Sequence, residues 1–133
     1  MTKIESALNF HKKGFNCAQS AALPFCDDLG LDPILVSKSL EGFGAGMGGF
    51  ELTCGALSAA IYIAGIINAD GNLNAPSSKR STYIICKELC SKFKESCGSA
   101  ICGEIKGLNT GKVLSSCDKC IICSVELIEN MLK

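Results

Sequence analysis

The sequence predicts an all-α, single-domain protein, a bundle of five or six helices around one buried central helix. Residues 52–69 carry no charge, and a helix that is apolar on every side normally lies in the core of a bundle. Elsewhere apolar residues recur at spacings of three and four, the period of a helix, and strand signals are weak. The 133 residues suffice for one hydrophobic core but not for two. We therefore expect one domain over residues 1–133, with the central helix at about 53–68.

The first helix is predicted over Thr2–Lys13, where apolar residues share one face and Gly14 can end the helix. His11, the only histidine of the chain, falls on this face. Its imidazole is a candidate base or metal ligand. We prefer the interpretation that His11 is a structural residue at the boundary of the core.

A second helix is predicted over Asn16–Leu29. The asparagine can cap this helix, and Gln19 completes a capping-box pattern, which places Cys17 at the first helical position. Pro24 lies inside the segment and should kink the helix or end it early. Cys26 follows the proline, and we interpret it as a small buried apolar residue.

A third helix is predicted over residues 32–41, opened by an Asp-Pro pair. The glycine-rich loop after it contains GAGMGG, which matches the nucleotide-binding pattern GxGxxG only formally, because no strand precedes it and no βαβ unit surrounds it. The backbone N–H groups of Gly44, Gly46 and Gly48 are weak candidates for cofactor binding, as donors to sulfur. A flexible or tightly packed turn is an equally good interpretation.

Thr53 is the predicted N-cap of the central helix, so that Cys54 lies in its first turn. A thiol there faces free backbone N–H groups and the positive end of the helix dipole. Both favour the thiolate, which is the form that attacks disulfides and binds metals. Cys17 has the equivalent place in its own helix, so these two thiols are the first candidates for catalytic cysteines.

A long helix is predicted over residues 78–96, with an apolar stripe that includes Cys86, Cys90 and Cys97 at its end. Cys86 and Cys90 are adjacent on this face and could bind metal or form a crosslink. An apolar stripe at helical spacing is, however, more often part of a hydrophobic core. Ser99 can then cap a short turn that holds Cys102.

The last helix is predicted to begin at Ser115 or Ser116 and to carry Cys117, Cys120 and Cys123. Its CxxCxxC spacing resembles the start of a ferredoxin motif, but the final Cys-Pro element is missing. Neighbouring members of this triplet share a helix face, whereas all three cannot point at one small centre without distortion.

Composition excludes several classes of partner and location. Lys plus Arg and Asp plus Glu are both 13, and tryptophan is absent, which argues against nucleic acid as a partner. Glu51 and Asp70 flank the uncharged segment, with no Lys or Arg nearby, so we expect no membrane span. The N-terminus lacks the apolar core of a signal peptide, and 47% of the chain is hydrophobic. We therefore expect a cytoplasmic protein whose ten cysteines are free or metal-bound thiols. A mostly apolar chain with few charges can also present a surface for a homodimer.

Five segments carry a resemblance to a known family. They are FNCAQ at 15–19, GFGAGMG at 42–48, TCGALSA at 53–59, GSAICGEIKG at 98–107 and KCIIC at 119–123. In this order they resemble the C_GCAxxG_C_C family, redox-active proteins of about this length that are named for four cysteines and a CGAxxG motif. The chain departs from that motif at Ala59, where the family has glycine.

The resemblance implies that the four family cysteines are Cys17, Cys54, Cys102 and Cys120, with Cys117 as the rival for the last place. It implies redox activity and assigns no substrate. The remaining cysteines match no family position, which supports their interpretation as core residues; they are Cys26, Cys86, Cys90, Cys97 and Cys123.

Three functions follow as hypotheses. The first is an electron-transfer module in which Cys17, Cys54, Cys102 and Cys120 bind an iron–sulfur cluster, most simply [2Fe–2S], and serve a redox partner protein that the sequence does not identify. The alternative is a metal-free thiol–disulfide redox protein, an oxidoreductase with Cys54 as the reactive thiolate and one of the other three as resolving cysteine. A structural zinc site in an interaction module is a further alternative, disfavoured because a large apolar core folds without metal.

Overall fold

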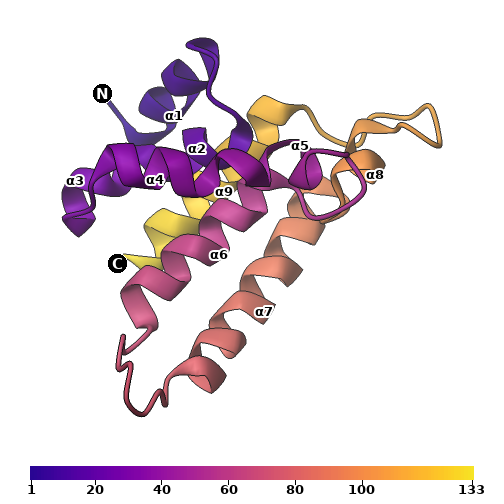
Figure 1. Cartoon of the computed structure of the whole chain (residues 1–133). Helices are drawn as coiled ribbons and strands as arrows, with labels where there is room; N and C mark the ends of the chain where they lie inside the picture. The colour runs from indigo at the N-terminus through magenta and orange to yellow at the C-terminus, as the bar shows by residue number, and fades with distance from the viewer.

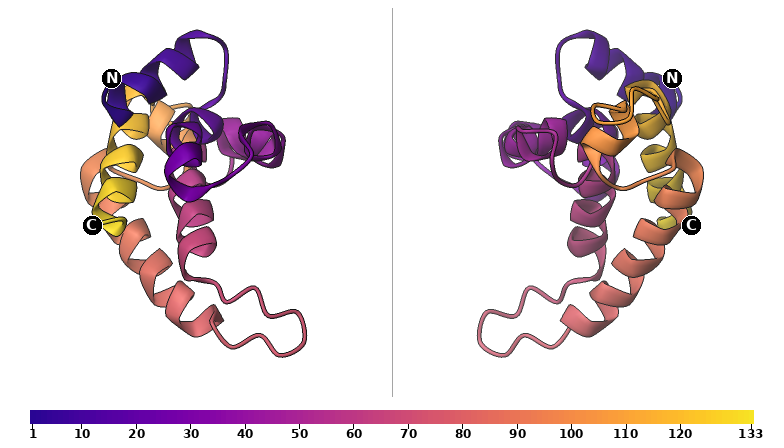
Figure 2. Two further views of the ribbon diagram at one scale, coloured as in Figure 1. Left: turned by 90° about the vertical axis from the view of Figure 1, so that its left-hand side faces the viewer. Right: turned by 90° about the vertical axis from the view of Figure 1, so that its right-hand side faces the viewer.

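The computed structural model describes the whole chain, residues 1–133, and consists of helices and their connections (Figures 1 and 2). Six helices have six or more residues: α1 (Lys3–Lys12), α2 (Cys17–Ala22), α4 (Pro33–Leu40), α6 (Gly55–Asn68), α7 (Lys79–Cys97) and α9 (Cys117–Met131). Shorter helical segments are α3 (Cys26–Leu29), α5 (Gly44–Met47), α8 (Cys102–Lys106) and the 3₁₀ turns η1 (Leu23–Phe25) and η2 (Glu41–Phe43). The predicted all-α class is confirmed, since the structure has no sheet.

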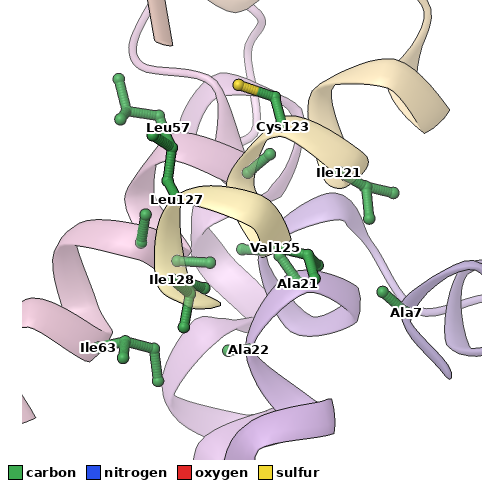
Figure 3. Close-up of a cluster of buried hydrophobic side chains, with 14 of the residues drawn as sticks. Ala7, Ala21, Ala22, Leu57, Ile63, Ile121, Cys123, Val125, Leu127 and Ile128 are labelled. Atoms are coloured by element: carbon green, nitrogen blue, oxygen red, sulfur yellow. The ribbon is translucent and has the colours of Figure 1, made fainter. Parts of the chain in front are cut away.

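Helix α6 is the central helix of the bundle and contacts α2, α7 and α9. Its first ten residues, Gly55–Ala64, are buried or half-buried, and Leu57 and Ile63 have no exposed surface. Figure 3 shows these two side chains in the core beside residues of α9. The C-terminal end is less covered, because Ile66 and Ile67 are 41% and 38% exposed. None of the helices combines the length and the hydropathy that a membrane crossing requires.

A buried hydrogen bond sets α9 against α6. The Ser124 hydroxyl donates to the Ala56 carbonyl over 2.6 Å, and both residues are fully buried. A buried hydroxyl needs such a partner, so this bond holds the two helices in one register. Cys120 precedes Ser124 by one helical turn, and the same register therefore places its thiol beside the N-terminus of α6.

Capping side chains begin four helices, and the sequence predicts two of these caps, Asn16 and Asp32, and offers Ser116 as one of two alternatives for a third. The Asn16 side chain accepts the Gln19 N–H, and the Gln19 side chain accepts the Asn16 N–H, a complete capping box at the start of α2. Thr2, Asp32 and Ser116 cap α1, α4 and α9. The proline inside the predicted second helix acts as expected, because α2 gives way there to η1 and then to α3.

The predicted N-cap of the central helix was wrong by one residue. Cys54, not Thr53, is the N-cap, and α6 begins at Gly55. The physical reason is long-range pairing: Thr53 lies in an isolated antiparallel bridge with Ile101, which keeps its backbone extended. Sequence reasoning from capping preference alone cannot see a bridge between segments almost fifty residues apart.

The glycine-rich segment before α6 is a turn with left-handed backbone angles. Ala45, Met47 and Phe50 have φ angles of 53°, 65° and 65°, although none is a glycine. Such conformations cost of order 1–3 kcal/mol each and persist only where the surroundings impose them. Gly46, with φ 57°, is closely packed against the later cysteine segment, since a Cβ there would lie 2.6 Å from the Cβ of Cys102.

Replacing Gly46 or Gly48 by alanine separates backbone strain from close packing. Both glycines have positive φ, but no atom lies within 4 Å of a Cβ placed at Gly48. Gly48→Ala should therefore lower the free energy of unfolding by about 1–2 kcal/mol, through left-handed strain alone. Gly46→Ala should lower it by about 1–3 kcal/mol more, because its methyl group overlaps Cys102. Urea unfolding followed by circular dichroism measures both, and equal losses would contradict the close approach.

Candidate functional site

Five of the ten cysteines lie around one pocket of about 200 Å³ that opens to solvent. They are the five that the sequence singles out, and we call this the cysteine pocket. Its lining comprises His11, Asn16, Cys17, Ala45, Phe50, Cys54, Gly55, Cys102, Ile105, Lys106, Ser115, Cys117 and Cys120. All ten cysteines of the chain are free thiols. The structure thus brings the predicted cysteines together, and their chemical role stays a prediction.

Helix starts position four of these thiols. Cys17, Cys102 and Cys117 are the first residues of α2, α8 and α9, and Cys54 is the N-cap of α6. Four helix N-termini therefore lie at one pocket. Cys120 differs, because it lies one turn inside α9 and is only 2% exposed.

The bridge between the two strand-like segments holds Cys54 against Cys102. The Cys54 N–H donates to the Ala100 carbonyl over 2.7 Å, and the Cys102 N–H donates to the Leu52 carbonyl over 2.9 Å. These bonds use the backbone groups of both cysteines and leave their side chains at the pocket wall. Cys54 and Cys102 are 5% and 6% exposed.

The surroundings of Cys54 favour its thiolate. Its pKa is lowered to about 7 from 9.0, first because the Cys120 thiol donates a hydrogen bond to its sulfur. Burial acts in the opposite direction, but N–H groups of Ala56 and Leu57 and the charge of Lys106 lower the pKa further. A thiolate is therefore present in the pocket near neutral pH, as the position of Cys54 at the start of the central helix predicts.

Cys120 is the protonated member of this pair. Its pKa is raised well above the ordinary range, first by the hydrogen bond that it donates to Cys54, then by burial and by the negative charge of Cys54. Two touching thiols cannot both ionise readily, so the contact divides them into one thiolate and one thiol.

Cys17 has the predicted position but not the expected ionisation. Burial is the main reason that its pKa is raised, followed by the negative charges of Cys117 and Cys54 and a hydrogen bond with Cys117. Helix α2 has only six residues, so its dipole offers little compensation. Cys102 is similar, with its pKa raised by burial and by the charge of Cys54.

Lys106 is a pocket residue that sequence reasoning missed. Its Nζ donates to the Cys117 sulfur over 3.4 Å and lies 5.7 Å from the centre of the Phe50 ring. Burial lowers the pKa of Lys106, but the nearby sulfurs of Cys117, Cys102 and Cys17 raise it overall, so the ammonium stays charged. The available signal was its spacing, four residues after Cys102, which puts both side chains on one side of α8.

The other candidates occupy supporting positions. His11 lines the pocket at its edge, and its Nδ1 lies 3.2 Å from the Asp118 carboxylate, a contact that joins α1 to the start of α9. Among the predicted glycines, a Cβ at Gly44 would overlap the Asn16 side chain, and the Gly48 N–H donates to the Gly44 carbonyl over 2.9 Å. Close packing is thus the observed feature of Gly44 and Gly46, and donation to a cofactor stays a prediction for all three glycines.

Hydrogen bonds join four of the pocket thiols in two pairs, Cys54 with Cys120 and Cys17 with Cys117, and the charges of Cys54 and Cys117 also act on Cys102. No group of three or more cysteine, histidine or acidic side chains has the arrangement needed to hold a metal ion. The remaining five cysteines lie outside the pocket lining.

Alkylation by iodoacetamide should report the Cys54 thiolate. Because only the thiolate reacts, we expect its rate to be half-maximal at pH about 7 instead of about 9. Lys106→Gln removes a positive charge, so it should raise that midpoint and slow the reaction at pH 7, with little effect above pH 9. Lys87→Gln, on α7 and outside the pocket, is the matched control. Peptide mass spectrometry measures each cysteine separately, and an ordinary thiol midpoint for Cys54 would refute this description of the pocket.

Comparison with known proteins gives one match. The model of the family described as "Putative redox-active protein (C_GCAxxG_C_C)" covers residues 15–131, which include all five pocket cysteines. Searches of curated proteins and of solved structures found no match. The resemblance seen in the sequence motifs is thereby confirmed. The chain belongs to the C_GCAxxG_C_C family of redox-active proteins.

Proposed function

We propose that the protein carries out thiol–disulfide exchange in the cysteine pocket, with Cys54 as nucleophile and Cys120 as resolving cysteine. The observation that supports this function is the hydrogen-bonded contact of the two sulfurs, one favoured as thiolate and the other held as thiol. The sequence alone put an iron–sulfur cluster first. The hydrogen bond between Cys120 and Cys54, which favours one thiolate and one thiol, is the reason that we put exchange first.

The reaction in the reducing direction has two displacement steps. The Cys54 thiolate attacks one sulfur of a substrate disulfide, a Cys54–substrate bond forms, and the other substrate sulfur leaves as a thiolate that takes a proton from solvent. Cys120 then gives up its proton and attacks the Cys54 sulfur, which forms the Cys54–Cys120 disulfide and releases the second substrate thiol. The substrate gains two electrons and two protons, and the protein dithiol loses two electrons.

The contact between the two sulfurs also sets the order of these steps. While Cys54 is a thiolate, its charge and its hydrogen bond hold the proton on Cys120. Once Cys54 is bonded to a substrate sulfur, it carries no charge, and those two causes of the raised Cys120 pKa are removed. Cys120 therefore becomes a better nucleophile only after the mixed disulfide has formed.

Access to the pocket limits the class of substrate. Cys54 and Cys120 are 5% and 2% exposed, whereas Cys17 and Cys117 are half-buried. A disulfide has to enter the pocket to reach Cys54, which favours a small molecule or an extended segment of a partner protein. Free thiols persist in a reducing compartment, so we place the protein in the cytoplasm.

Cys120→Ser should trap the first intermediate. With oxidised glutathione as substrate, this variant should accumulate a Cys54–glutathione mixed disulfide, whereas the wild type should pass through it to the Cys54–Cys120 disulfide. Cys54→Ser should form neither. Cys26→Ser is the matched control, because Cys26 is also buried, at 3% exposed, but lies outside the pocket. Intact-mass and peptide mapping give the result, and equal glutathionylation of Cys54→Ser would rule out Cys54 as the nucleophile.

An iron–sulfur cluster is the second candidate. Five cysteines line the pocket, and the N–H groups of Ala56 and Leu57 already point at the Cys54 sulfur, the kind of bond that tunes a cluster. Cys17, Cys54 and Cys102, with Cys120 or Cys117, would hold the cluster as thiolates, and it would supply one-electron transfer. Zinc on the same thiolates is the further alternative, and it would be structural.

Cys102→Ser distinguishes cluster binding from thiol exchange, because Cys102 has no part in the two displacement steps. After anaerobic purification, the cluster hypothesis expects iron, sulfide and visible absorption in the wild type and their loss in Cys102→Ser. Exchange predicts that Cys102→Ser still reduces oxidised glutathione at nearly the wild-type rate. Zinc analysis of the same samples tests the structural-metal alternative, and a wild type without iron after attempted reconstitution would exclude the cluster.

A further inference from the structure

The cysteine pocket contains one fixed cation and no carboxylate. Among the residues that line the pocket, Lys106 is the only lysine or arginine, and none is an aspartate or a glutamate. Two acidic side chains in adjoining segments have partners of their own. The Glu104 carboxylate accepts the Ser99 hydroxyl over 2.6 Å, and the Asp118 carboxylate pairs with His11 at the pocket edge. The charge of the lysine is therefore not neutralised by a carboxylate of the lining.

The Lys106 ammonium is held in place and still has donors to offer. Its Nζ donates to the Cys117 sulfur over 3.4 Å and lies 5.7 Å from the centre of the Phe50 ring. Lys106 ends α8, which lies beside α5 (Figure 1). None of the ion pairs of the chain includes Lys106. Because an ammonium has three donors, a ligand in the pocket can receive a further hydrogen bond from it.

The first displacement step changes the balance of charge in the pocket. Before the attack, the Cys54 thiolate is negative and the Lys106 ammonium nearby lowers its pKa. In the mixed disulfide the Cys54 sulfur is neutral, so the ammonium loses that opposite charge. A carboxylate on the substrate half that stays bonded to Cys54 restores the balance, whereas an ammonium there adds repulsion.

We propose that the substrates of the cysteine pocket are small disulfides that carry carboxylates, and that Lys106 binds one of these carboxylates. The proposal rests on the proposed thiol–disulfide exchange and leaves its two displacement steps unchanged. Lys106 neither gains nor loses a proton in them and selects the substrate by charge. A cysteine inside a protein segment has its main-chain carboxyl group in a peptide bond, so it lacks this charge beside its sulfur.

Three small disulfides of similar size test the selection by charge. Dithiodipropionate, hydroxyethyl disulfide and cystamine carry a carboxylate, a hydroxyl and an ammonium on each half. Each is mixed with reduced protein at pH 7, and the loss of the free Cys54 thiol is followed by quenching with N-ethylmaleimide and peptide mass spectrometry. Each rate is divided by that of free mercaptoethanol with the same disulfide, which removes differences in intrinsic reactivity. We expect the carboxylate disulfide to react about tenfold or more faster than the ammonium disulfide, with the hydroxyl disulfide between them.

Substitution of Lys106 tests whether this cation is the cause. Lys106→Gln should lower the ratio of carboxylate to ammonium rates by about fivefold or more, whereas Lys106→Arg, which keeps the charge, should retain the ratio. Lys106→Gln also raises the pKa of Cys54, but the same thiolate attacks all three disulfides, so that effect cancels in the ratio. Lys87→Gln, outside the pocket, should leave the ratio unchanged. Added sodium chloride should lower the wild-type ratio, since salt screens an attraction between charges.

The possible failures are distinguishable. Equal normalised rates for the three disulfides, or the same ratio in Lys106→Gln as in the wild type, would refute selection by Lys106 and leave the proposed exchange intact. No oxidation of Cys54 by any of the three would refute the exchange itself, and the selection with it. The wild-type ratio and its dependence on salt need no variant to fold.

Discussion

The absence of a side chain at Gly55 decides where the cysteines of this protein meet. A Cβ on this first residue of α6 would lie 2.9 Å from the Phe43 carbonyl oxygen and 3.2 Å from the backbone nitrogen of Ala18. The N-terminus of α6 can therefore touch that of α2, and the residues just before these contacts, Cys54 and Cys17, line one pocket. Any larger residue would separate the two helix ends and the two thiols with them.

The pocket shows how a protein can bury a thiol and still ionise it. Burial raises the pKa of most of its cysteines, but at Cys54 a thiol donor and two N–H groups outweigh burial. Ionisation of one sulfur then suppresses it in the neighbours that touch it. The pocket of this member of a redox-active family thus holds one thiol, Cys54, whose surroundings favour the thiolate.

The strained turn before α6 supports the same pocket from the other side. Phe50 is held at φ 65°, where its carbonyl accepts the Gly103 N–H over 2.6 Å and its ring lies under the Lys106 ammonium. These contacts fix α8, which carries both Cys102 and Lys106. The unfavourable backbone angles are therefore offset by contacts that position a cation and a thiol at the site.

Sequence alone determined the helical class, the caps at Asn16 and Asp32, and the identity of the five pocket cysteines. Hydrophobic period, capping chemistry and family motifs are local patterns, which is why they could be found without the structure. For the last helix, the sequence left the cap open between Ser115 and Ser116, and the structure has Ser116. The sequence placed the start of α6 one residue early, and it expected the Cys17 thiol to ionise as readily as that of Cys54. It also overlooked Lys106. The first two depend on groups distant in the chain, the bridge to Ile101 and the neighbouring sulfurs, whereas Lys106 had a local signal in its spacing from Cys102. Only the tertiary structure could decide which thiols touch, since ionisation follows from contact and not from spacing along the chain.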